Sequence, residues 1–281
     1  MEDPCFASIR HNMKLTEIEP SVMTSKCSIK SMNTDCFYSA KPTYYFGLNQ
    51  EMGGLHATEK GVGVEALYNT EHKTWMIIRT RMHISKLAHW PEDISLITWP
   101  QEGYRLYCPR AVKAYDEKGD ELFNAENWWV IMDLERKRPC KPEYILSSLP
   151  PADKAKHYFD PAFPQFPKEE EYEGERLEPW QVKINYYDTD YNRHVNNISY
   201  VNWILDALPK EFLDSYMPTL LDVKWIHQCF LTDDLTVFTY SKTGYSDENP
   251  SLYSKIMRGD EVVFEATSEW KRRTNNEVAS C

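Results

Sequence analysis

The strongest constraint on the fold is an internal repeat, in which the second half of the chain returns to the pattern of the first after about 140 residues. Three matches set this offset: Asp93-Ile-Ser-Leu with Asp234-Leu-Thr-Val, Gly119-Asp120 with Gly259-Asp260, and Trp129 with Trp270. In each half, an apolar stretch with helical spacing precedes four stretches in which apolar and polar residues alternate. Because a helix and a sheet each bury one apolar face, each half is predicted to pack its helix against its own antiparallel sheet.

The expected elements follow one order in both halves. Helices are expected over residues 43–58 and from Val195 to Leu208, where Pro209 ends the second helix. Strands are expected over residues 75–86, 94–99, 106–115 and 122–132, and again over 180–186, 220–231, 235–242, 251–258 and 261–270. Two such units in one polypeptide predict an α+β fold, a tandem double hotdog in which a long antiparallel sheet wraps the helix of each half.

Proline content divides the chain between the two halves. Eight of the 17 prolines fall between residues 139 and 179, where they would interrupt helices and strand ladders and favour an extended linker. The predicted organisation is an irregular N-terminal extension (1–40), an N-terminal hotdog domain (41–138), a Pro-rich linker (139–179), a C-terminal hotdog domain (180–272) and a tail (273–281).

Charge and cysteine content narrow the function classes. The formal net charge is −11, whereas a nucleic-acid-binding protein would carry a basic excess. No apolar run approaches the length of a membrane span, and no signal peptide is recognisable. The seven cysteines include no CxxC pair and no common zinc spacing, so we expect reduced thiols, no metal, no cofactor and a cytoplasmic location.

The candidate site is a short polar loop ahead of the second helix. Asp190, Asn192 and His194 fall within five residues and combine a carboxylate, an amide and an imidazole. An imidazole can move protons near neutral pH, and an amide can orient a substrate or a water molecule. The same residue types also cap helices, so a purely structural capping loop is the alternative interpretation.

The stretch from Asp190 to Leu205 resembles the signature of the acyl-ACP thioesterase family, in which an Asp-x-Asn-x-His-Val-Asn-Asn run precedes Tyr and Trp-Ile. Arg79-Thr-Arg-Met-His-Ile and His89-Trp-Pro-Glu-Asp in the first half agree with it, and the resemblance covers roughly residues 40 to 272. It implies hydrolysis of the thioester between a fatty acyl chain and acyl carrier protein, with the acyl-phosphopantetheine arm as the group bound. It also implies that Asp190, Asn192 and His194 are catalytic. Gln228 stands where the family has a catalytic Glu, and Cys229 follows it.

Two mechanisms are open at this point. In one, water placed by Asn192 and Gln228 attacks the thioester, with Asp190 or His194 as base; in the other, Cys229 is a nucleophile supported by His194 and Asn192. In both, N–H groups that open the helix after His194 are expected to hold the oxyanion. Alternation along a strand would place Gln228 and Cys229 on opposite faces, and we favour the Gln228 face.

Several properties are left open by the sequence. An acyl-CoA thioesterase and a non-catalytic acyl-thioester-binding protein are the alternative functions. The basic run Arg136-Lys-Arg with Lys141 is a candidate contact for an acidic carrier protein or the pantetheine phosphate, and a solvated strand end is the alternative interpretation. An apolar tunnel between helix and sheet is expected for the acyl chain. Its depth, the chain-length preference and the choice between monomer and homodimer are not predicted.

Overall fold

The computed structural model describes residues 13–153 and 164–274, which divide into two units. Unit 1 runs to Met76 and continues from Ser85 to Ala162, and unit 2 combines Ile77–Ile84 with the chain from Phe163 onward. Strand β3 (Lys73–Ile84) therefore lies mostly in unit 2, although it precedes half of unit 1. Parts of the expected extension (1–12), linker (154–163) and tail (275–281) lie outside the described residues.

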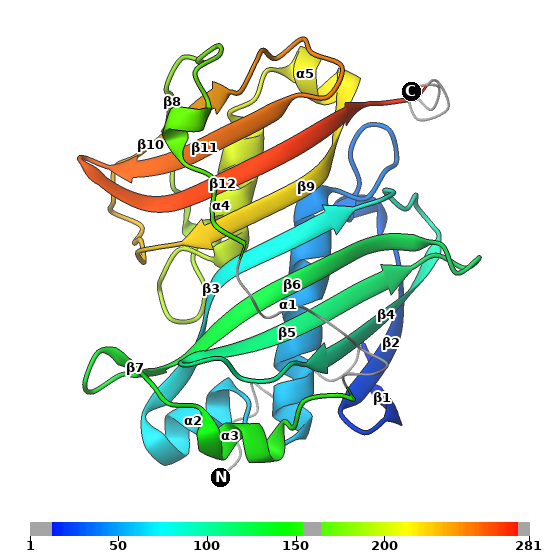
Figure 1. Ribbon diagram of the computed structural model, residues 1–281, viewed down its shortest axis with the longest axis vertical. Helices are drawn as coiled ribbons and strands as arrows, with labels where there is room; N and C mark the ends of the chain where they lie inside the picture. The colour runs from blue at the N-terminus through cyan, green and yellow to red at the C-terminus, as the bar shows by residue number, and fades with distance from the viewer. Residues whose placement is uncertain (1–12, 154–163, 275–281) are drawn as a thin grey trace. The chain divides into compact units, whose positions relative to one another are not determined.

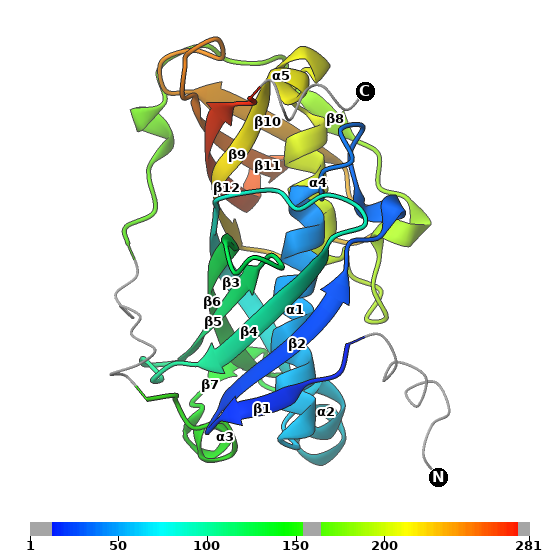
Figure 2. The same ribbon diagram turned by 90° about the vertical axis from the view of Figure 1, so that its right-hand side faces the viewer.

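Unit 1 is a long helix beside an antiparallel sheet, and Figures 1 and 2 show α1 (Pro42–Glu59) along one face of that sheet. Pro42 suits the first helical turn, where its missing N–H has no partner to lose. Tyr45, Phe46 and Met52 are fully buried on the helix. The strand order is β1-β2-β4-β5-β6, with β7 on β6. The remaining elements are β1 (Thr16–Glu19), β2 (Val22–Ser28), α2 (Val64–Glu71), β4 (Asp93–Pro100), β5 (Tyr107–Tyr115), β6 (Glu121–Asp133), β7 (Arg138–Cys140) and α3 (Glu143–Ser148).

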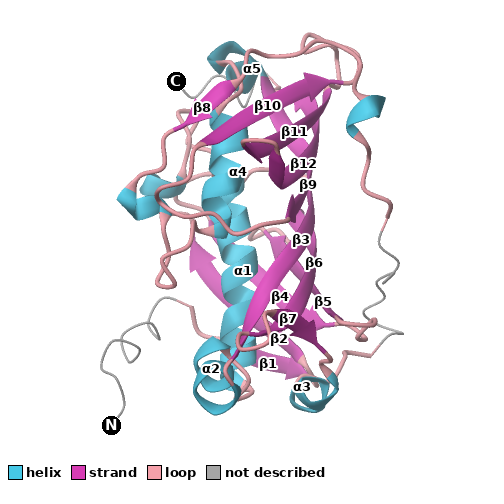
Figure 3. Ribbon diagram, turned by 90° about the vertical axis from the view of Figure 1, so that its left-hand side faces the viewer, coloured by secondary structure: helices cyan, strands magenta, loops and turns pink. Residues whose placement is uncertain are grey.

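Unit 2 has the same plan, with α4 (Asn197–Asp206) alongside its sheet in Figure 3. Tyr200, Val201 and Ile204 form part of the buried face of α4, which explains why the apolar residues of this stretch have helical spacing. The strand order is β3-β9-β12-β11-β10-β8. The remaining elements are β8 (Trp180–Val182), α5 (Lys210–Ser215), β9 (Tyr216–Trp225), β10 (Leu235–Ser241), β11 (Ser251–Arg258) and β12 (Glu261–Arg272).

The two matched Gly-Asp pairs occupy equivalent hairpins. Gly119 lies between β5 and β6 with φ 86°, and Gly259 lies between β11 and β12 with φ 57°. These positive φ values favour glycine, since a Cβ is strained in this region. The predicted order of a helix followed by four strands is confirmed along both halves of the chain, although most of β3 belongs to unit 2.

The N-terminal extension is a correction to the sequence prediction. Residues 16–28 form β1 and β2 rather than irregular chain, and β2 pairs with β4 along its length. Val22, Met23 and Ser25 are buried there. The stretch is short and largely polar, so its strand character depends on pairing with β4, which residue periodicity does not reveal.

The Pro-rich linker is also more structured than expected. Its first part contains α3, and Ile145 and Leu149 join a buried cluster of unit 1. Its second part lies across unit 2: Glu169 pairs with Lys255 on β11 at 2.6 Å. Further along, the Gly174 N–H donates to the Ser241 carbonyl at 3.0 Å, and a Cβ on Gly174 would approach that oxygen to 2.8 Å. This part of the linker therefore packs on unit 2: it forms a short 3-10 helix at Glu169–Glu171 and then pairs with the end of β10.

Candidate functional site

The predicted polar loop is a closed turn built on one carboxylate. Asp190 Oδ1 accepts hydrogen bonds from the backbone N–H groups of Asn192 at 2.8 Å and His194 at 3.2 Å. The Asp190 N–H donates to the His194 carbonyl at 2.8 Å, which closes the turn. Arg193 has φ 63°, the left-handed conformation that lets the chain reverse here. Asn192 and His194 are therefore held on the same turn; the Asn192 side chain is exposed and that of His194 is half-buried.

The N–H groups near the start of α4 differ from the expectation that they are free to stabilise an oxyanion. The Val195 N–H donates to the Cys229 carbonyl at 2.8 Å, and the Asn196 N–H to the Asp188 carbonyl at 2.7 Å. Asn196 then caps the helix, since its Oδ1 accepts from Ile198 N at 2.8 Å and its carbonyl accepts from Ser199 N at 3.0 Å. These four N–H groups already have partners within the protein, so they are not available to a substrate oxygen.

The segment carrying Gln228 also departs from the expected geometry. β9 ends at Trp225, and the N–H groups of Ile226 and His227 both donate to the Val263 carbonyl, at 3.0 and 3.1 Å. Two successive N–H groups on one acceptor break the strand ladder, so the predicted alternation over residues 220–231 does not extend to Gln228. Gln228 is nevertheless exposed, whereas Cys229 is fully buried.

Backbone hydrogen bonds and one ring contact join this segment to the loop. The Cys229 carbonyl accepts from Val195, and the Cys229 N–H donates to the Tyr200 hydroxyl at 3.0 Å. The rings of His194 and Phe230 meet edge to face, with centroids 5.2 Å apart. In the part of the chain that the structure describes, no hydrogen bond joins the Gln228 side chain to Asn192 or His194. The fold thus brings the two segments together without linking the candidate side chains directly.

Arg258, which the sequence analysis did not single out, holds the Gln228 segment. Its Nη1 donates to the Gln228 carbonyl at 3.2 Å and to Asp233 Oδ2 at 2.8 Å, and its Nη2 donates to Glu261 Oε2 at 2.6 Å. Hydrogen bonds to Glu261 and Asp233 raise the pKa of Arg258, which keeps it charged. No local motif reveals this role, because the partners lie on separate segments of unit 2.

Cys229 is in an unfavourable setting for a nucleophile. Its side chain has no exposure, and burial raises the pKa of its thiol. The thiolate, not the thiol, is the attacking species, so both effects lower its reactivity. The cysteine behaves as a small buried apolar residue at the joint between the loop and the segment after β9.

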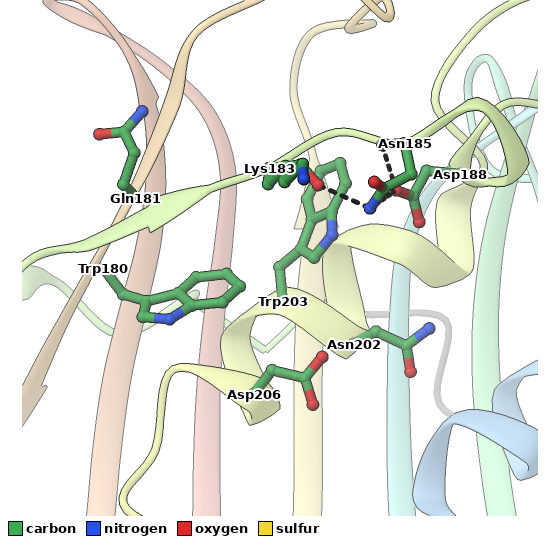
Figure 4. Close-up of a pocket in the computed structure, with 8 residues that line it drawn as sticks. All are labelled: Trp180, Gln181, Lys183, Asn185, Asp188, Asn202, Trp203 and Asp206. Carbon is green, nitrogen blue, oxygen red and sulfur yellow. Dashed lines mark hydrogen bonds between the residues drawn. The ribbon is translucent and has the colours of Figure 1, made fainter.

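A pocket of about 330 Å³ lies beside the loop and contains none of the four predicted catalytic residues. Figure 4 shows Trp203, Asn202 and Asp206 of α4 on one side and Asn185 and Asp188 on the other. Trp180, Gln181 and Lys183 complete its lining. The Asp188 carboxylate is held by the Asn185 N–H at 2.7 Å. This polar pocket does not match the expected apolar tunnel, which stays a prediction.

The described part of the chain has neither a candidate metal-binding cluster nor a helix that could cross a membrane. Residues 13–153 and 164–274 contain no cluster of three or more His, Cys, Asp or Glu side chains that could hold a metal ion. No helix in these ranges is long and apolar enough to cross a membrane.

Comparison with known proteins identifies relatives of both halves. The family model of the acyl-ACP thioesterase N-terminal domain matches residues 20–146, and that of the C-terminal domain matches residues 171–272. Oleoyl-acyl carrier protein thioesterase 1, chloroplastic, from Arabidopsis thaliana is 24% identical over 266 residues, covering 82% of this chain and 70% of that protein. The palmitoyl-acyl carrier protein thioesterase, chloroplastic, from Cuphea hookeriana is 24% identical over 70% of this chain, which spans only 48% of that relative.

Solved structures show the same fold. The 12:0-ACP thioesterase from Umbellularia californica superposes with a TM-score of 0.75 at 17% identity, covering 92% of this chain and all of that one. At this identity the likeness concerns the fold, and it confirms the predicted tandem double hotdog. Because the two family models match in order and together span most of the sequence, this chain belongs to the acyl-ACP thioesterase family.

Proposed function

We propose that this protein hydrolyses the thioester of fatty acyl-[acyl carrier protein] and releases the free fatty acid. The observation that carries the proposal is the turn built on Asp190, which holds Asn192 and His194 on one hydrogen-bonded loop. Family membership of both halves supports the reaction class. The chain spans about half to 70% of the length of these curated relatives. Their activity therefore supports the proposal but does not establish it.

The chemistry assigns one task to each side chain. His194 removes a proton from water as the water oxygen attacks the carbonyl carbon of the thioester. Asn192 donates its amide N–H to the developing oxyanion, because the N–H groups of Val195, Asn196, Ile198 and Ser199 already have partners. When the C–S bond breaks, the imidazolium returns the proton to the thiolate of the pantetheine arm. Gln228 orients the water but takes no proton.

This assignment favours the water mechanism over the nucleophile mechanism. Cys229 is buried and its thiol pKa is raised, whereas Gln228 is exposed on the same segment. We also propose that the reaction takes place in the cytoplasm. The cysteines that the structure describes are free, which is compatible with a reducing compartment.

The residue at position 228 supports one alternative, a protein that binds acyl thioesters without hydrolysing them. Because Gln228 replaces the Glu expected from the family resemblance, the protein could bind acyl thioesters without cleaving them. Such a protein would hold acyl-ACP tightly and release neither fatty acid nor thiol.

The experiment measures free thiol and free fatty acid from a series of acyl-ACPs and acyl-CoAs. Asn192→Ala and His194→Ala are expected to lower turnover on acyl-ACP by about 100-fold or more while folding is retained. Asn249→Ala and His72→Asn are matched controls, since both residues are exposed and lie outside the candidate site, and they are expected to stay within about twofold of the wild type.

Three results would contradict the proposal. Wild-type protein that binds acyl-ACP without releasing thiol would select the binding-only alternative. Faster turnover on every acyl-CoA than on the matching acyl-ACP would select an acyl-CoA thioesterase. Turnover of both loop variants within twofold of the wild type would remove Asn192 and His194 from the mechanism.

A further inference from the structure

Unit 1 contains a second copy of the candidate loop. Asp35 Oδ1 accepts from the N–H groups of Phe37 at 2.9 Å and Ser39 at 3.0 Å, and the Asp35 N–H donates to the Ser39 carbonyl at 2.8 Å. Tyr38 has φ 59°, at the place where Arg193 has φ 63° in unit 2. These are the same hydrogen bonds and the same reversal as in the Asp190 turn.

The surroundings of the two loops also match. In unit 1 the Ala40 N–H donates to the Ala88 carbonyl at 2.7 Å, as Val195 does to Cys229. The Ala88 N–H donates to the Tyr45 hydroxyl at 2.7 Å, as Cys229 does to Tyr200.

The next turn repeats as well. The His89 N–H donates to Glu92 Oε2 at 3.0 Å, as the Phe230 N–H does to Asp233 Oδ2 at 3.0 Å. One chain therefore carries the same construction twice.

The two copies differ at the positions proposed for chemistry. Phe37 stands in place of Asn192, Ser39 in place of His194, and Leu87 in place of Gln228. All three replacements are buried, with exposures of 6%, 1% and 3%. The unit 1 copy has thus lost the amide, the imidazole and the second amide, and it offers no accessible polar group in their place. It has kept the aspartate.

From this comparison we infer that Asp190 is a positioning residue rather than the base or nucleophile of the reaction. The inference rests on the proposed function, whose catalytic group it narrows to Asn192, His194 and Gln228. An aspartate that makes the same backbone bonds in a loop without chemistry is explained by the turn alone. Its carboxylate orders the N–H groups of residues 192 and 194 and so sets the direction of their side chains. The proton from water then goes to His194.

The test uses paired substitutions in both copies. Asp190→Asn keeps an oxygen acceptor for the two N–H groups and removes the carboxylate, whereas Asp190→Ala removes both. Asp35→Asn and Asp35→Ala are the matched pair in unit 1. For each variant we would measure kcat and KM on acyl-ACP, the pH dependence of kcat/KM, and hydrogen–deuterium exchange of residues 33–41 and 188–196.

The positioning role predicts rescue by the amide. Asp190→Asn is expected to keep kcat within about tenfold of wild type with an unchanged acid limb of the pH profile, while Asp190→Ala loses about 100-fold. Exchange in residues 188–196 should rise in Asp190→Ala and not in Asp190→Asn. Asp35→Ala should raise exchange in residues 33–41 in the same way without lowering kcat.

Two outcomes would overturn the inference. One is an Asp190→Asn variant as inactive as Asp190→Ala while its loop keeps wild-type protection, since the carboxylate would then act in the chemistry. The other is an Asp190→Ala loop as protected as in the wild type. If the wild type hydrolyses no acyl thioester, the proposed function fails, and the exchange measurements still decide whether Asp190 orders its turn.

Discussion

In the proposed mechanism, Gln228 limits which group can take the proton from water. A carboxamide donates and accepts hydrogen bonds but takes no proton at neutral pH, so it can place a water molecule and leave it neutral. His194 has no hydrogen-bond partner for its ring nitrogens among the described residues, and its ring meets that of Phe230 in a T-shaped contact. An imidazole without a fixed partner can accept the proton from water and later return it to the leaving thiol.

Gln228→Glu should therefore accelerate hydrolysis. A carboxylate at this exposed position adds a second group that can take the proton from water, and we expect kcat on acyl-ACP to rise by about tenfold. Steady-state release of thiol measures the change. Gln165→Glu, another exposed glutamine in unit 2, adds the same charge away from the loop and should leave kcat unchanged. No gain from Gln228→Glu, together with inactivation by Cys229→Ala, would support the buried thiol as nucleophile.

The positions of the candidate residues could be predicted only in part. Asp190, Asn192 and His194 could be placed on one loop because they fall within five residues directly ahead of a predicted helix. The partners of the N–H groups at Val195 and Asn196 could not be predicted, since their acceptors are carbonyls of Cys229 and Asp188 that only the fold brings near. For this reason, the expectation that the Val195 and Asn196 N–H groups hold the oxyanion was wrong.

The packing of helix α1 on the sheet of unit 1 is unusually polar. Asn49 and Asn127 exchange two side-chain hydrogen bonds, at 2.8 and 2.7 Å. Arg110 Nη1 on β5 donates to His56 Nδ1 at 3.0 Å and to Thr98 Oγ1 at 3.1 Å. Burial and the neighbouring guanidinium lower the pKa of His56 to about 3, so His56 is neutral and accepts the hydrogen bond from Arg110.

This pair should make unit 1 sensitive to acid. In the unfolded chain His56 has an ordinary pKa near 6.5. As the pH falls below that value, His56 becomes protonated in the unfolded state but stays neutral in the folded state. The free energy of unfolding therefore falls between pH 6.5 and pH 3, by up to about 1.4 kcal/mol per pH unit from this group alone. His56→Gln, which keeps an acceptor for Arg110, should flatten that slope in denaturant titrations over the same range.

The control for this measurement is His72→Asn, at an exposed left-handed position where asparagine is tolerated. Both variants lose one histidine, so carboxylates that titrate in the same pH range cancel in the comparison. An unchanged slope in His56→Gln would show that His56 is protonated in the folded protein.

Most elements were predictable because their periodicity matches their burial. β10 alternates buried and half-buried residues along its whole length, and the predicted strand over 235–242 was confirmed within one residue. Strand β2 was not predicted, because its burial comes from pairing with β4. The end of β9 was not predicted either. Two N–H groups that share the Val263 carbonyl interrupt the strand there, although the composition of the stretch still favours a strand.

At the scale of the whole chain, the repeat was the most informative signal. It fixed the order of elements in both units, and the unit 1 loop shows that it extends further than its three sequence anchors. The division between the two units falls within the predicted Pro-rich linker, but the predicted N-terminal domain differs from unit 1, because most of β3 belongs to unit 2. The bidentate pair of Arg79 with Asp222, at 2.7 and 2.6 Å, ties β3 to β9 there.

The charge of the whole molecule raises the question of how an acidic carrier protein is recognised. The chain carries a formal net charge of −11, yet Arg136, Lys137, Arg138 and Lys141 form an exposed basic run in unit 1. Long-range repulsion is screened beyond about 10 Å at 0.1 M salt, so a local basic contact can outweigh the net charge. We predict that Arg136→Gln with Lys141→Gln lowers kcat/KM on acyl-ACP by about tenfold at low salt.

The effect should depend on the carrier and on salt. A neutral acyl-pantetheine thioester carries no acidic protein, so its kcat/KM should be equal in the variant and the wild type. Raising the salt towards 1 M, where screening acts within about 3 Å, should make the kcat/KM of the variant equal to that of the wild type on acyl-ACP as well.

The control variant, Lys118→Gln with Lys210→Gln, removes two exposed positive charges elsewhere. It distinguishes the loss of a local contact from a change in net charge. If this control pair lowers kcat/KM on acyl-ACP as much as the basic-run pair, net charge governs the encounter and the basic run is not the contact. If the basic-run pair also slows the pantetheine thioester, its residues act on the site itself.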